Sequence, residues 1–179
     1  MGYMLQDDSV EGRPSAFAYW GNIIAVGLEP KNVVLLDAIT GNRTSVLSGH
    51  MDVIFSLTFS LGGTPLVSVS EDETIKLWDV QTGGVAKTFS NGTSSVSSVS
   101  ISPDSATVAS GTSNGAIKLW DVRTGNCHPS VMRHDGAVTA IGFSPLDPRR
   151  LISSSADGDV RQWEVNGHQI ETPIAEQPP

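Results

Sequence analysis

Short runs of β-forming residues, separated by turn residues, follow one another along almost the whole chain. Between residues 53 and 89 they predict four strands, at 53–60, 66–70, 74–80 and 86–89, because Gly, Pro or Asp interrupts the chain between them. No stretch shows the sustained apolar period of a helix. The pattern therefore predicts an all-β protein made of four-stranded meanders.

Both faces of these sheets are expected to be buried. Alternation along 74–80 places Ile75 and Leu77 on one face of the strand, and Trp78 and Val80 on the other. A sheet with apolar groups on both faces needs a neighbour on each side, as the stacked blades of a propeller have.

The same arrangement recurs at a fixed interval. Two series of large side chains repeat every 42 or 43 residues, namely Trp78, Trp120 and Trp163, and Phe59, Ile101 and Phe143. We expect Leu36 to take the first place of the tryptophan series and Phe17 that of the other. The chain then contains four copies, beginning at residues 17, 59, 101 and 143, and a fixed period of this kind indicates a repeat architecture.

The copies share short motifs besides their spacing. IKLWD stands at 75–79 and again at 117–121, Gly49-His50 precedes the second copy, and Ser-Pro-Asp occupies 102–104. In these features residues 16–170 resemble the WD-repeat family, which implies a β-propeller with four blades in this chain. AYWGNIIAVG and VLLDAITG further resemble the WD arrays of fungal NACHT-type signalling NTPases.

The repeat divides the chain into consecutive blades with a segment at each end. We expect an N-terminal segment at 1–15, with an extra strand as one option, and a disordered tail at 173–179. The blades are expected at 16–48 for a divergent first blade, 49–90 for the second, 91–132 for the third and 133–172 for the fourth.

The resemblance implies a buried hydrogen-bond relay in a blade, built from a Trp, a Ser or Thr, a His and an Asp. A buried indole N–H needs an acceptor, and the other three groups satisfy one another in turn. The matching residues are Trp78, Ser70, His50 and Asp72 in the second blade, and Trp163, Ser155, His134 and Asp157 in the fourth.

The other two blades depart from this pattern. In the third, Trp120 and Thr112 remain, but Gly92 replaces the histidine and Asn114 the aspartate, so an incomplete relay is expected. The first blade has Leu36, Leu28, Pro30 and Asp8 at the four places, which makes it the weakest match. An atypical terminal repeat is usual in such arrays.

Two groups of residues invite a chemical interpretation. Ser, His and Asp together suggest a hydrolase, but a trio repeated in two blades favours a structural role, and no catalytic residue is predicted. Cys127 and His128 are neighbours on the chain, yet no second Cys or His lies at ligand spacing, so neither a metal nor a cofactor is predicted.

Charge and cysteine content restrict the partners. The net charge of −8 and the pI near 4.8 disfavour nucleic acid and membrane surfaces, and neutral or basic proteins fit better. A single cysteine and the lack of a targeting signal indicate an intracellular, cytoplasmic protein. By resemblance, partner contacts are expected at the starts of the innermost strands, at Val53, Phe55, Ser95, Ser97, Ala137 and Thr139.

These features predict a non-enzymatic scaffold for protein–protein interaction. The alternative is a structural fragment of a larger propeller in a signalling receptor, with the ligand site elsewhere, and a hydrolase is the third option. Four blades would leave two apolar faces bare. We therefore expect self-association into a homodimer with an eight-bladed ring, at about 45° per blade.

Overall fold

The computed structural model describes residues 12–90, 92, 94–129, 132–165 and 169–170. In this part of the chain every regular element is a β-strand, and no helix is long and apolar enough to cross a membrane. The strands are β1 (Pro14–Trp20), β2 (Ile23–Leu28), β3 (Asn32–Asp37), β4 (Arg43–Leu47), β5 (Ile54–Phe59), β6 (Leu66–Ser70), β7 (Thr74–Trp78), β8 (Val85–Ser90), β9 (Val96–Ile101), β10 (Thr107–Thr112), β11 (Ile117–Asp121), β12 (Cys127–His128), β13 (Val138–Phe143), β14 (Arg150–Ser155), β15 (Val160–Glu164) and β16 (Gln169–Ile170).

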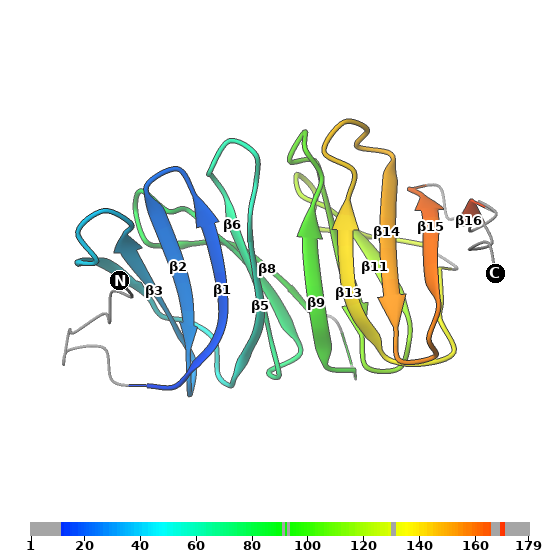
Figure 1. Ribbon diagram of the computed structural model, residues 1–179, viewed down its shortest axis with the longest axis horizontal. Helices are drawn as coiled ribbons and strands as arrows, with labels where there is room; N and C mark the ends of the chain where they lie inside the picture. The colour runs from blue at the N-terminus through cyan, green and yellow to red at the C-terminus, as the bar shows by residue number, and fades with distance from the viewer. Residues whose placement is uncertain (1–11, 91, 93, 130–131, 166–168, 171–179) are drawn as a thin grey trace, which may run out of the picture.

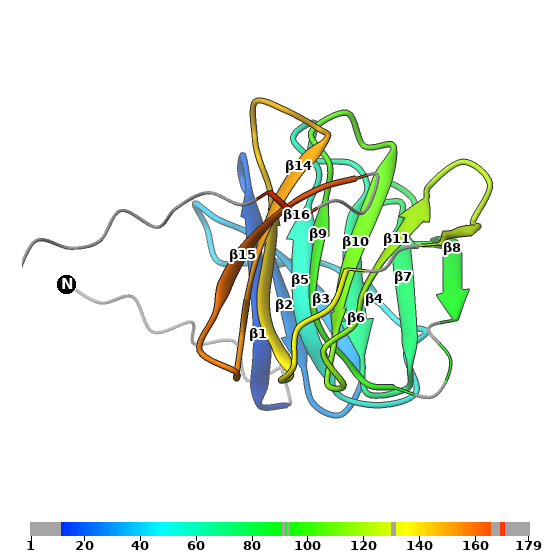
Figure 2. The ribbon, with the colours of Figure 1, turned by 90° about the vertical axis from the view of Figure 1, so that its right-hand side faces the viewer.

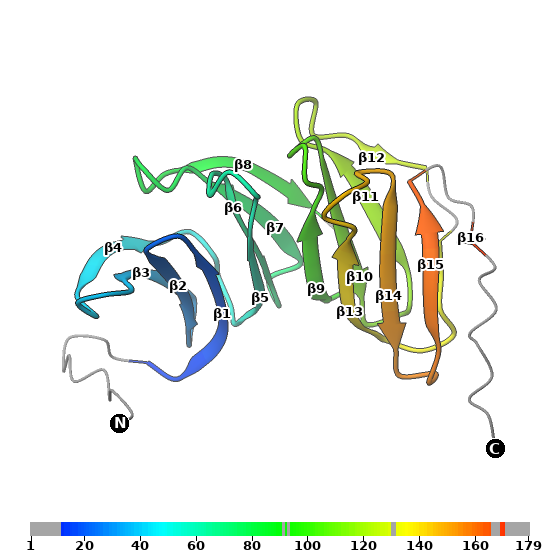
Figure 3. The same cartoon turned by 45° about the horizontal axis from the view of Figure 1, so that its top comes forward.

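The strands form four antiparallel sheets of four strands each, and every sheet is a meander of consecutive strands. We call them the first to fourth sheets, β1–β4, β5–β8, β9–β12 and β13–β16. Figures 1 and 3 show them in chain order from one end of the molecule to the other. Figure 2 looks along this row, with β14 and β15 in front. Neighbouring sheets meet mainly through their innermost strands, β1, β5, β9 and β13.

The all-β prediction is confirmed, as is the place of the three tryptophans on the third strand of consecutive sheets. Trp78 ends β7, and Trp120 and Trp163 lie one residue before the ends of β11 and β15. The first strand begins at Pro14, two residues before the expected boundary of the first blade. The extra strand considered for the N-terminal segment and the disordered tail at 173–179 concern residues outside the described part, apart from 12–15.

We call the face of a sheet that packs against the preceding sheet its front face and the face that packs against the following sheet its back face, and we use the same names for the corresponding outer faces of the first and fourth sheets. Three apolar clusters fill the junctions between consecutive sheets. Trp78 on the front of the second sheet, for example, packs with Leu35 and Leu47 on the back of the first. A fourth cluster, centred on Val34 and Leu36, lies on the front face of the first sheet.

The position of Phe17 differs from the sequence prediction. Phe59 pairs with Leu66, and in the first sheet the corresponding pair is Tyr19 with Ile24, so Tyr19 takes the place predicted for Phe17. The reason is the short β1–β2 turn, in which Trp20 already pairs with Ile23. A fixed offset of 42 residues fails here because this connection is two residues shorter.

The innermost strand of every sheet has a β-bulge near its start. The residues left unpaired are Ser15, Phe55, Ser97 and Thr139. A bulge redirects a side chain and bends the strand locally. Three of the six positions expected to contact a partner are therefore bulge residues.

Candidate functional site

The second sheet contains a continuous chain of buried hydrogen bonds. The Trp78 indole N–H donates to Ser68 Oγ at 2.7 Å, and Ser68 Oγ lies 2.7 Å from His50 Nε2. His50 Nδ1 is 2.8 Å from Asp72 Oδ2. Because a carboxylate only accepts, Nδ1 carries the proton, and Nε2 accepts from the Ser68 hydroxyl. Every group in the relay thus has a partner.

Asp72 is the point where this relay is anchored to two loops. Its carboxylate accepts from the Met51 N–H in the β4–β5 connection, and from the N–H and hydroxyl of Thr74 at the start of β7. Burial by itself raises the pKa of Asp72, but the hydrogen bonds from Thr74, Met51 and His50 outweigh it and hold the pKa at about 2. Burial lowers the pKa of His50, which is consistent with a neutral ring.

The fourth sheet repeats the arrangement. Trp163 donates to Ser153 Oγ at 2.8 Å, His134 Nε2 lies 2.8 Å from the same oxygen, and His134 Nδ1 is 3.2 Å from Asp157 Oδ2. Hydrogen bonds from the backbone N–H groups of Asp159 and Asp135, the first of them the strongest, hold the pKa of Asp157 at about 2.

The relay hydroxyls are not the predicted ones. Ser70 and Ser155 lie on the same face as the tryptophans, but the indole reaches the serine two residues nearer along the neighbouring strand. Ser70 instead accepts from the Asp72 N–H and donates to the Asp52 carbonyl. Ser155 likewise accepts from the Asp157 N–H. Both serines stabilise the turn that carries the aspartate.

A signal for the true relay serines was present in the sequence. Ser68, Ser110 and Ser153 each stand ten residues before the tryptophan of their repeat. The series Ser70, Thr112 and Ser155 repeats equally well. Periodicity therefore cannot choose between them, and the reach of the indole decides.

The third sheet retains only the first bond of the relay. Trp120 donates to Ser110 Oγ at 3.0 Å, while the histidine position holds Gly92, whose φ of +88° favours glycine. Thr112 donates to Asn114 Oδ1 rather than to a relay histidine. The Asn114 amide donates to Ser94 Oγ at 2.8 Å.

In the first sheet the indole and its acceptor are replaced together. Leu36 occupies the tryptophan position and Val26, ten residues earlier, the serine position. An aliphatic side chain at residue 36 needs no hydrogen-bond acceptor, so a hydroxyl at residue 26 would have no function.

The Ser-His-Asp trio cannot act as a catalytic triad. Ser68 is 0% and His50 1% exposed, and the serine hydroxyl is already shared between an indole and an imidazole. A nucleophile must reach its substrate and have an oxyanion site beside it. The relay is therefore a structural element of the sheet.

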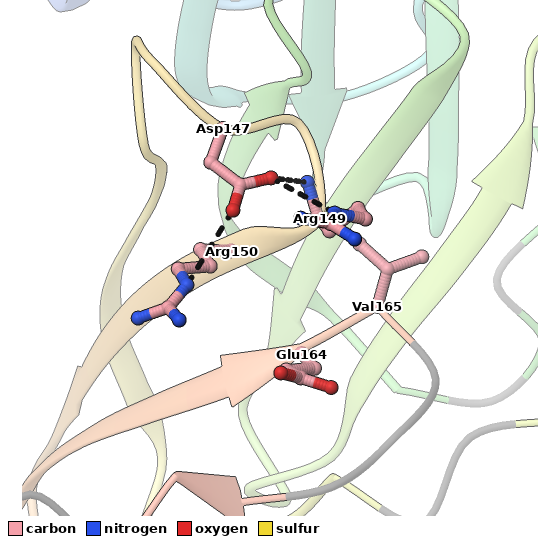
Figure 4. Close-up of a pocket in the computed structure, with 5 residues that line it drawn as sticks. All are labelled: Asp147, Arg149, Arg150, Glu164 and Val165. Carbon is pink, nitrogen blue, oxygen red and sulfur yellow. Dashed lines mark hydrogen bonds and ion pairs between the residues drawn. The ribbon is translucent and has the colours of Figure 1, made fainter.

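A pocket of about 410 Å³ lies at the edge of the fourth sheet, between the β13–β14 loop and the end of β15 (Figure 4). Asp147 pairs with both Arg149 and Arg150, through their Nε atoms at 3.2 and 3.4 Å, and Glu164 and Val165 complete the lining. The acidic and basic groups balance one another. In the described part of the chain, no group of three His, Cys, Asp or Glu side chains could hold a metal.

The six positions expected to bind a partner fall into two sets. Val53, Ser95 and Ala137 immediately precede the innermost strands, and each accepts through its carbonyl from the turn after the second strand. These three residues fasten the end of their sheets. The other three, Phe55, Ser97 and Thr139, are the bulge residues.

Phe55 differs from the other bulge residues. Ser97 Oγ donates to the Val138 carbonyl in the next sheet, and Thr139 Oγ1 bonds to Ser154 Oγ. Ser15 Oγ donates to the Gly27 carbonyl. Phe55 is apolar and 40% exposed, and so it offers a contact surface where the other three make internal hydrogen bonds.

Acidic residues lie in the two loops at the end of the second sheet where Phe55 stands. The β4–β5 connection brings Met51, which is 77% exposed, and Asp52, and the β6–β7 turn brings Glu71 and Glu73, also exposed. Both segments lie where β5 begins, because β6 ends and β7 starts at that edge. We call Met51, Asp52, Phe55, Glu71 and Glu73 the acidic rim.

Comparisons with known proteins complete this description. The family model described as "WD domain, G-beta repeat" matches residues 41–79, 83–121 and 125–164. Each match starts two residues before the outermost strand of one sheet and ends within one residue of the end of the third strand of the next. No curated protein matches the sequence. The crystal structure of the computationally designed Ika4 protein is similar, with a TM-score of 0.80 and 28% identity over 92% of this chain and 99% of that one.

Proposed function

Because this chain belongs to the WD-repeat family, we propose that it is a non-enzymatic cytoplasmic scaffold that holds a protein partner at the acidic rim. The observation that carries the proposal is the exposure of Phe55 and Met51 among carboxylates. Aromatic side chains and methionine are enriched at protein interfaces, where a few apolar anchors supply most of the binding energy.

The charge of the acidic rim suggests the chemistry of the partner. Asp52, Glu71 and Glu73 are exposed, and the whole chain carries a net charge of −8. Such a surface attracts a segment with Lys or Arg and speeds its association. We therefore propose a basic segment with at least one apolar residue for the Phe55 and Met51 contact.

A peptide-display selection tests this proposal. A random peptide library is selected on the immobilised chain, and the enriched peptides are expected to be basic with an apolar residue. Phe55→Ser and Glu71→Lys should each weaken their binding at least tenfold. Leu61→Ser is the matched control, because Leu61 is 62% exposed in a loop at the other end of β5. Acidic peptides, or equal losses from Phe55→Ser and Leu61→Ser, would contradict the proposal.

The second candidate is a structural part of a larger propeller in a signalling receptor, whose ligand site lies elsewhere. The segments that resemble fungal NACHT-type NTPases, AYWGNIIAVG and VLLDAITG, belong to the first sheet. Phe17 and Tyr19, on the front face of this sheet, are 79% and 65% exposed, which favours a further sheet packed against them. If the further sheet belongs to a second copy of the chain, the result is an eight-bladed ring shared by two chains, and this case can be tested with the chain alone.

A further inference from the structure

The front face of the first sheet is aliphatic where the other sheets are polar. The second sheet has Ser68, Ser70, Lys76 and Trp78 at four front-face positions, and the first sheet has Val26, Leu28, Val34 and Leu36 there. Leu28, Val34 and Leu36 are only 4% exposed within the single chain, whereas along the inner edge of the same face Phe17 is 79% and Tyr19 65% exposed. Aromatic groups so exposed beside an apolar cluster mark a surface that packs against something.

The back face of the fourth sheet is the matching end of the row. Ile152 and Val160 stand there, 45% and 51% exposed. Their counterparts in the third sheet, Ala109 and Ile117, are buried against the fourth. The two ends of the row are thus one front face and one back face, which are the two kinds of face that meet at every internal junction.

The internal junctions also follow a size rule along the innermost strands. Small back-face residues pack with large front-face residues of the next sheet, as Ala16 and Ala18 do with Leu57 and Phe59 in one cluster. In another junction Ser98 and Ser100 accept hydrogen bonds from the backbone N–H groups of Ile141 and Phe143.

The outer faces of the first and fourth sheets show the largest difference in side-chain size. The back face of β13 presents Ala140 and Gly142, and the front face of β1 presents Phe17 and Tyr19. The smallest pair of back-face residues would therefore stand opposite the bulkiest front-face pair. Interiors pack to high density only when large and small side chains alternate in this way.

We propose that the front face of the first sheet packs against the back face of the fourth sheet of a second copy. Two such junctions close a ring of eight sheets, at about 45° per sheet. A front face joined to a back face is a heterologous contact, and a two-fold axis makes the two junctions identical. This inference is independent of partner binding at the acidic rim, and the two can fail separately.

Light scattering across a concentration series gives the first test. The 179-residue chain is expected at twice 18.9 kDa at micromolar concentration. Phe17→Asp and Ala140→Lys, on opposite sides of the proposed junction, should each weaken the dimer at least tenfold and leave a folded monomer, as verified by circular dichroism. Leu146→Lys is the control, because Leu146 is 94% exposed in the β13–β14 loop and lies on neither face.

Mixing the two variants gives the decisive test. Phe17→Asp and Ala140→Lys chains should form a heterodimer, because one junction is then native and the other pairs Asp with Lys. A contact between two first sheets would leave the Ala140→Lys variant dimeric, and this result would overturn the proposal. A folded monomer of the unaltered chain, as expected if further blades of a longer polypeptide cover these faces, or a mass that grows without limit would also overturn it.

Discussion

In the second and third sheets, different side chains link the connection from the preceding sheet to the turn after the second strand. Both have a tryptophan bonded to a buried serine, Trp78 to Ser68 and Trp120 to Ser110. In the second sheet His50 continues this bond to Asp72, whereas in the third Asn114 bonds to Ser94 at the surface. Either link ties the connection between two sheets to the turn after the second strand.

The difference indicates which parts of the relay the fold requires. The indole–serine bond is present in each of the three sheets that have a tryptophan near the end of the third strand, because a buried N–H must be satisfied. The histidine is one of two ways to fasten the adjoining loops. In the buried version the groups depend on one another, so losing one leaves the others without partners.

Among variants that compare the two sheets, Asp72→Ala is expected to cause the largest loss of stability. This change leaves the His50 and Met51 N–H groups without their acceptor, and we expect a loss of about 2–3 kcal/mol in the free energy of unfolding. Asn114→Ala in the third sheet should cost about 1 kcal/mol or less, because its bond to Ser94 is exposed and the buried Thr112 hydroxyl keeps the Ala116 carbonyl as an acceptor. Urea denaturation measures both, and equal losses would contradict the contrast between the sheets.

Ser68→Ala should have the next largest effect, about 1–3 kcal/mol, because both the Trp78 N–H and His50 lose a partner. Ser110→Ala removes only the acceptor of Trp120 and should cost less. Ser70→Ala serves as the control for the predicted but incorrect relay position, and we expect about 1 kcal/mol from the loss of its turn bonds. A greater loss from Ser70→Ala than from Ser68→Ala would contradict the assignment of Ser68 to the relay.

Acidification should weaken the second sheet in two steps. Burial lowers the pKa of His50 below the 6.5 of the unfolded chain, so stability falls once the pH drops below about 6.5 and the unfolded chain alone binds the proton. The pKa of Asp72 is about 2 in the folded protein, against 3.8 unfolded, so its contribution is present above about pH 4 and lost towards pH 2.

We expect the Asp72 step to amount to about 1–2 kcal/mol, since water screens part of the interaction. Urea denaturation between pH 7 and pH 2 measures the profile. His50→Gln should flatten its upper part and Asp72→Asn its lower part. An unaltered profile in both variants would show that other groups control the acid response.

The smallest effect is expected at Ser60, where removing the side-chain hydroxyl breaks no hydrogen bond. In the described part of the chain, its hydroxyl is the buried side-chain polar atom without a hydrogen-bond partner, whereas the equivalent Ser102 donates to Asp104. Ser60→Ala should change stability by less than about 0.5 kcal/mol or increase it slightly, and Ser102→Ala should cost about 1 kcal/mol. Thermal unfolding of both variants distinguishes them.

Much of the fold could be predicted because the period and the alternation are local properties. In the second sheet the predicted 74–80 and 86–89 differ from β7 (Thr74–Trp78) and β8 (Val85–Ser90) by one or two residues. The tryptophan series located the third strands for the same reason. The Phe17 prediction failed because a shorter hairpin shifts the register by two residues, and a fixed period of 42 residues does not account for this shift.

The sequence by itself determined the number of sheets and the order of their strands, since repeat length and side-chain alternation set these, and its resemblance to WD repeats implied the residue types of the relay. Only the tertiary structure decided that Ser68 and Ser153, not Ser70 and Ser155, meet the indoles. Two serines on one face of a strand look identical in the sequence. The physical reason for the choice is distance across the sheet, because an indole N–H can bond only to the hydroxyl within about 3 Å of it.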